Sequence, residues 1–98
     1  MESFKDIIQS SKPTLVDFFA TWCGPCKAMA PVLDQLKKEM GEEVRVLKID
    51  VDKNQKVAAQ FQVRGVPTFV LFKEGKIVWR QSGGMSISTL KSQIKQFT

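Results

Sequence analysis

The stretch that decides the fold is residues 14–27, which read TLVDFFATWCGPCK. Its first seven residues are almost all apolar and include β-branched and aromatic side chains, which is typical of a short strand buried on both faces. From Ala28 onward, apolar residues recur at helical spacing, with lysines in the last turns, and Gly41 is a helix stop. Cys23 and Cys26 therefore flank the point where a strand gives way to a long helix.

The start of this helix favours negative charge on Cys23. The amide N–H groups of a first helical turn have no partner within the helix, and they stabilise an anion at the N-terminus. Pro25 suits this turn, because it lacks an amide hydrogen and its backbone is already close to helical. We therefore expect Cys23 to be substantially a thiolate near neutral pH, which is the form that attacks disulfides.

A Cys-x-x-Cys pair has three other possible uses. Structural zinc needs about four ligands from Cys, His and carboxylates, and this chain has two cysteines and no histidine, so a closed site would require dimerisation. A structural disulfide across such a short loop constrains the unfolded chain by only roughly 2 kcal/mol. Two idle buried thiols would need neither a helix start nor Gly-Pro between them. The pattern favours reversible thiol-disulfide exchange.

The rest of the sequence predicts a single α/β domain over residues 1–98. At 98 residues and 43% hydrophobic content, the chain is long enough for one core and too short for two. Glu74-Gly75 is typical of a tight hairpin, and Ser86 of a helix N-cap. A strand, a helix and a parallel strand followed by a hairpin give a mixed central sheet with helices on both faces. The predicted strands are residues 14–20, 44–51, 68–73 and 76–81, and the shorter predicted helices are 3–10, 54–60 and 87–97.

The formal charge of +5 arises from 15 basic and 10 acidic residues that are scattered along the chain. Scattered lysines are typical of a solvated surface and no nucleic-acid motif accompanies them, so we expect no nucleic-acid partner. No apolar run is long enough for a signal or a bilayer crossing, so we expect no membrane partner. A retained Met1 and a reactive dithiol favour a cytoplasmic protein. A secreted form whose leader was replaced by Met1 stays open.

Asp17 is the second informative residue, because it interrupts a run that we expect to be buried on both faces. A carboxylate is costly to bury and tends to stay protonated there. The alternative is a solvent-facing position on a half-exposed strand. Lys48 lies in the neighbouring predicted strand, with Leu47 and Ile49 facing the opposite way, and is the natural partner of Asp17. Two charges buried together would titrate as a coupled pair.

From about residue 4 to the end, the chain resembles the thioredoxin family in five segments that follow the family's order. They are residues 16–27, 30–31, 48–52, 65–69 and 83–84. The Trp-Cys-Gly-Pro-Cys-Lys string is the most specific, since the residues between the cysteines differ in related oxidases and isomerases. The resemblance implies the thioredoxin fold, with about four strands flanked by four helices. The family's usual first edge strand is missing, so we expect residues 44–51 to form an uncovered edge that a neighbouring chain could occupy.

The resemblance also implies roles for individual residues. Asp17 would be a buried acid behind the disulfide that accepts the proton of Cys26, with Lys48 beside it. The Val66-Pro67 bond would be cis and lie against the disulfide, although the base rate for X-Pro bonds favours trans. The backbone of Val66 would then pair with an extended substrate.

Substrate recognition is expected on the surface around Cys23. Trp22 precedes the nucleophile on a turn, with a core role as the alternative, and Gly24 lies between the cysteines. Gly83 and Gly84 allow another backbone to approach closely, with a plain turn before the last helix as the alternative. The expected apolar patch comprises Trp22, Pro25, Val66, Pro67 and Met85.

The function that follows is a protein disulfide reductase. Cys23 attacks a substrate disulfide, and Cys26 then attacks Cys23 and releases the reduced substrate. No bound cofactor or metal is needed. By resemblance, electrons come from NADPH through a thioredoxin reductase, the substrates include reductases and peroxidases that end their cycle as disulfides, and the chain is expected to be a monomer. Two rivals remain, a disulfide oxidase or isomerase, against which Gly24-Pro25 argues, and a non-catalytic docking subunit.

Overall fold

The computed structural model describes residues 3–98, and it alternates strands and helices along the chain. The elements are α1 (Phe4–Ile8), β1 (Thr14–Phe19), α2 (Gly24–Met40), a 3-10 turn (Gly41–Glu43), β2 (Arg45–Asp50), α3 (Gln55–Gln60), β3 (Thr68–Lys73), β4 (Lys76–Ser82) and α4 (Ile87–Lys95). Apart from the 3-10 turn, which was not predicted, each element lies within about two residues of its predicted range. The predicted element types are therefore confirmed over the described residues.

Within residues 3–98, the four strands form one mixed sheet in the order β2-β1-β3-β4. β1 runs parallel to β2, whereas β3 is antiparallel to both β1 and β4. The predicted position of β2 at an edge of the sheet is thus confirmed. The part of that prediction that concerns residues 1 and 2 lies outside the described residues.

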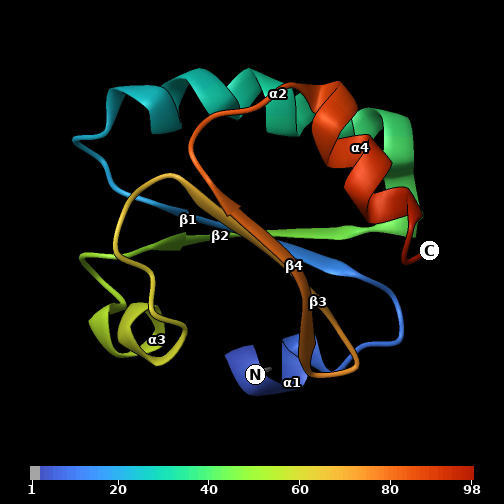
Figure 1. Ribbon diagram of the computed structural model, residues 1–98, viewed down its shortest axis with the longest axis horizontal. Helices are drawn as coiled ribbons and strands as arrows, with labels where there is room; N and C mark the ends of the chain where they lie inside the picture. Colours follow the sequence, from blue (N-terminus) through green and yellow to red (C-terminus); the bar gives the residue numbers. More distant parts are fainter. Residues whose placement is uncertain (1–2) are drawn as a thin grey trace.

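Helices cover both faces of the sheet, as predicted (Figure 1). On one face, α2 and α4 pack on a core that includes Leu15, Phe69 and Leu71. On the other, α1 and α3 pack on a core that includes Phe18 and Phe72. β1 and β3 are buried on both faces, because they are the two central strands. Among the described residues, none of the helices combines the length and the apolar character that a bilayer crossing needs.

Helix α2 carries the cysteine pair at its first turn. Cys23 is the N-cap residue, and Pro25 lies in the first turn, where its missing N–H costs nothing. Gly41 ends the helix with a φ of +54°, a conformation that favours glycine, and its N–H bonds to the Lys37 carbonyl. The fold thus holds the start of α2 directly beyond the end of the buried strand β1.

Candidate active site

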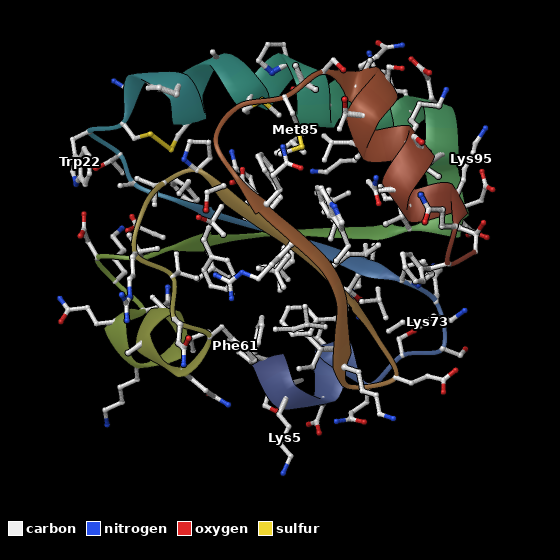
Figure 2. The ribbon with its side chains drawn as sticks, in the orientation of Figure 1. Lys5, Trp22, Phe61, Lys73, Met85 and Lys95 are labelled. Carbon is white, nitrogen blue, oxygen red and sulfur yellow. A yellow bond between two sulfur atoms is a disulfide. The ribbon has the colours of Figure 1, made fainter. Side chains whose placement is uncertain are left out.

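Cys23 and Cys26 are joined in a disulfide at the start of α2, with their Cα atoms 5.3 Å apart (Figure 2). The amide N–H of Cys26 donates to the Cys23 Sγ at 3.1 Å. The sulfur thus takes the place that a side-chain oxygen occupies in an ordinary N-cap. Because a thiolate accepts such a bond more strongly than a thiol, this geometry favours negative charge on Cys23.

Both cysteines are almost buried, with Cys23 4% and Cys26 5% exposed. In the disulfide form, little of Cys23 is therefore accessible to a substrate. The physical reason is that Cys23 is held inward by its bond to the Cys26 amide and packs with Ala20 and half-buried Val66. The exposed fractions of the two residues do not distinguish them, whereas the N-cap position of Cys23 does.

Asp17 is buried, with 1% of its surface exposed, and neither carboxylate oxygen accepts a hydrogen bond from another described residue. Burial raises the pKa of this carboxyl from 3.8 to about 6, against the positive charge of Lys48, which lowers it. The alternative of a solvent-facing Asp17 is thereby excluded. A buried group that titrates close to neutral pH is suited to proton transfer.

Lys48 is the direct partner of Asp17 in the parallel pairing of β1 and β2, but it is exposed. The expectation that both charges are buried together is wrong. The physical reason is that β2 is an edge strand, so the long side chain reaches solvent. The Lys48 Nζ lies 5.1 Å from the centroid of the Phe19 ring, where the aromatic face attracts it.

The Val66-Pro67 peptide is cis, as the resemblance implied. Pro67 is buried, and its carbonyl accepts the N–H of Gly83 at 2.8 Å. The structure thus brings the Gly83 backbone beside the proline segment. Gly83 has a φ of +96°, so the turn itself calls for glycine there, whereas exposed Gly84 has no such requirement.

Trp22 is 69% exposed, so a core role for it is excluded. Its Nε1 donates to the Asp52 Oδ2 at 2.9 Å, and the Asp52 N–H in turn bonds to the Asp50 Oδ1 at 2.9 Å. Asp52 is a site residue that the sequence reasoning missed. Asp50 and Asp52 stand out in the sequence as two acids at the end of a strand, but nothing local to them points to Trp22.

A small cavity of about 120 Å³ lies between Trp22 and the segment that leads to the cis proline. Met85, expected in the same apolar patch, lies apart from Trp22 in Figure 2 and packs partly against the core under α2 and α4. Only the exposed part of Met85 is available to a substrate.

Residues 3–98 contain no cluster of three or more Cys, Asp or Glu side chains suited to hold a metal ion. The arrangement instead combines a dithiol pair at a helix start, a buried acid and an exposed aromatic residue. This combination suits reversible disulfide exchange.

Comparison with known proteins agrees with this chemistry. A family model described as Thioredoxin matches residues 1–96. A thioredoxin of Acidithiobacillus ferridurans is 43% identical over 97 residues, which cover 98% of this chain and 86% of that protein. A bifunctional thioredoxin reductase/thioredoxin of Mycobacterium leprae is 47% identical over 87 residues, which cover 89% of this chain and 19% of that protein.

Among solved structures, a mutant thioredoxin from Halobacterium salinarum is similar over the whole fold. The TM-score is 0.88 at 40% sequence identity, and the match covers 96% of this chain and 81% of that chain. The expected fold and chemistry are confirmed together. The chain therefore belongs to the thioredoxin family, whose members are thiol-disulfide oxidoreductases.

Proposed function

We propose that this protein disulfide reductase uses Cys23 as the attacking sulfur and Cys26 as the sulfur that completes the exchange. The Cys23 thiolate attacks one sulfur of a substrate disulfide, which breaks that bond, forms a mixed disulfide and releases the other substrate sulfur as a thiolate that takes up a proton. Cys26 then loses its proton and attacks the Cys23 sulfur. The second substrate thiol leaves, and two electrons have passed to the substrate. The observation that carries this assignment is the Cys26 N–H bond to the Cys23 Sγ.

Asp17 is the group that takes the proton from Cys26 in this proposal. Its pKa of about 6 keeps it largely ionised, and so able to accept a proton, at neutral pH. Lys48 acts on Asp17 through its positive charge and is a positioning residue. Asp17 is buried on β1, the strand that leads into the start of α2, and burial supports a role toward Cys26 over one toward the incoming substrate.

Substrate binding is assigned to the rim of the disulfide. Trp22, Gly24 and Pro25 are exposed on one side, and the backbone of Val66 next to the cis proline offers pairing to an extended segment. Gly83 and Gly84 complete this rim, and buried Pro67 supports it by accepting the Gly83 N–H. Because Cys23 is only 4% exposed, a substrate must present its disulfide on a thin, extended or locally unfolded segment.

The electron source in this proposal is NADPH through a thioredoxin reductase. It is supported by the relative whose name joins a reductase and a thioredoxin. The proposed recipients are reductases and peroxidases that end their cycle as disulfides, so that the chain serves electron transport and cell redox homeostasis. We place the protein in the cytoplasm, since a dithiol carrier requires a reducing compartment. We also propose that it is a monomer.

Reduction of insulin disulfides by dithiothreitol tests the function. The protein is expected to accelerate insulin reduction above the rate of dithiothreitol alone, and the Cys23→Ser, Cys26→Ser double variant to return it to that rate. Equal acceleration by the double variant would contradict the proposal. A redox titration against glutathione separates the rivals, because a reductase stays oxidised at ratios that reduce an oxidase. Full biological activity of the double variant would instead indicate a docking subunit.

A further inference from the structure

A cavity of about 400 Å³ opens beside the disulfide, and it shares no lining residue with the smaller cavity next to Trp22. Its walls come from the end of β1, the first turns of α2 and the edge strand β2. They include Phe19, Ala20, Ala30 and the sulfur-bearing residue Cys26. Its volume lies within the range of about 300–1,000 Å³ that is common for small-molecule sites.

The charged residues that line this cavity are all positive. Lys27 and Lys48 are the charged residues that line it, beside the polar residue Thr21, and none of the described lining residues carries a carboxylate. Neither lysine forms an ion pair with another described residue. Contact with the Phe19 ring at 5.1 Å holds the Lys48 charge over the apolar wall. Asp17, the acid opposite Lys48, is buried and does not line the cavity.

We propose that this cavity binds small organic anions that carry an aromatic or aliphatic body and one carboxylate. The body would lie against Phe19 and Ala30, and the carboxylate would face the two lysines. Such a ligand would cover the Cys26 side of the disulfide and leave the Trp22 side open. It would be a binding site distinct from the protein-substrate surface proposed above.

The test uses 3-phenylpropionate, with the neutral 3-phenylpropionamide as the matched probe. Each is titrated into the oxidised protein while the backbone amides are followed by NMR, so no turnover is involved and the result is independent of the reductase function. For a ligand of this size the expected Kd is about 1–5 mM. The largest shifts are expected at Phe19, Ala30 and Lys48. The amide should bind about threefold more weakly, as an exposed charge contact predicts.

Three variants locate the site. Phe19→Trp places a larger ring on the wall, and Ala30→Leu fills the cavity from α2; each is expected to weaken binding at least about tenfold. Lys48→Met keeps the apolar stem and should weaken the anion about threefold and the amide little. Lys76→Met, a charge-matched change on the distant hairpin, should alter neither probe.

Two results would overturn the proposal. One is equal affinity for the anion and the amide. The other is a set of shifts or variant effects that maps outside the cavity, including unchanged binding in both cavity-filling variants. Far-UV circular dichroism of each variant verifies its fold, and the two filling variants approach the site from different elements, so one misfolded variant does not remove the test.

Discussion

Asp17 and Lys48 stand opposite one another in the pairing of β1 and β2, but the carboxylate is 1% exposed while the ammonium group lies in solvent above the Phe19 ring. The pair is therefore asymmetric. Lys48 remains solvated and acts on Asp17 across the strand pair. Burial therefore disfavours the charged form of Asp17 and not that of Lys48. The carboxyl consequently titrates at about 6 instead of 3.8.

The first prediction concerns stability and pH. Because the pKa of Asp17 is raised in the folded state, the folded protein holds a proton between about pH 4 and 6 that the unfolded chain has lost, so stability falls as pH rises through this window. The rise from 3.8 to about 6 corresponds to about 3 kcal/mol. We expect Asp17→Asn to lack this fall and to be more stable than the parent protein at pH 7.

Denaturant unfolding of both oxidised proteins from pH 4 to pH 8 measures this difference. The two free energies of unfolding should diverge up to about pH 6 and run parallel above it. Asp17→Asn should also release reduced substrate more slowly. If the two stability curves are parallel throughout, the pKa of Asp17 is not raised in the folded state. Unchanged turnover of Asp17→Asn at every pH would rule out the role of Asp17 in proton transfer.

The second prediction concerns Lys48. Its charge lowers the pKa of Asp17, so Lys48→Met should move the Asp17 titration to higher pH than in the parent, and Lys48→Arg should retain the parent value. Carboxyl carbon NMR of the oxidised protein reports this midpoint directly. Lys76→Met serves as the control for a general loss of positive charge. A Lys48→Met midpoint equal to that of the control would show that Lys48 does not influence Asp17.

Most of the fold was predictable because its elements carry local signals. Alternating or continuous apolar runs mark the strands, and Ser3 and Ser86 cap the first and last helices. The differences lie at the ends of elements, and they are largest at the helix ends. α4 ends at Lys95 instead of residue 97, yet Phe97 still packs on the core, which is why the apolar pattern extended the helix too far.

Site residues were predictable where their side chains differ from the pattern of the surrounding sequence. Asp17 is conspicuous as an acid within an apolar run, and its burial is confirmed. The exposure of Lys48 was missed because it depends on the position of β2 at the sheet edge and on the length of a flexible side chain. Asp52 was missed because its bond to Trp22 joins residues 30 positions apart, which no local pattern encodes.

The third prediction concerns that bond. Asp52→Ala removes the acceptor that orients the exposed Trp22 ring, and an exposed hydrogen bond contributes about 1 kcal/mol. We expect little loss of stability and a fall in kcat/KM for insulin of about threefold to tenfold. Asp52→Asn, which keeps an acceptor oxygen, should lose less. Asp34→Ala removes an exposed acid on α2 and controls for charge. An equal fall in kcat/KM in this variant would show that Asp52 has no specific role.

The last prediction distinguishes the two sulfurs, which exposure alone leaves equivalent at 4% and 5%. If Cys23 attacks first, Cys26→Ser stops the reaction after the mixed disulfide has formed, because no second sulfur remains to release the substrate. Mass spectrometry should then find Cys26→Ser covalently joined to a disulfide-containing protein substrate, whereas Cys23→Ser and the double serine variant stay free. Both single variants should also lose catalysis of insulin reduction. Accumulation of the adduct in Cys23→Ser instead would reverse the two roles, and with them the argument that the Cys26 amide at the start of α2 stabilises the attacking thiolate.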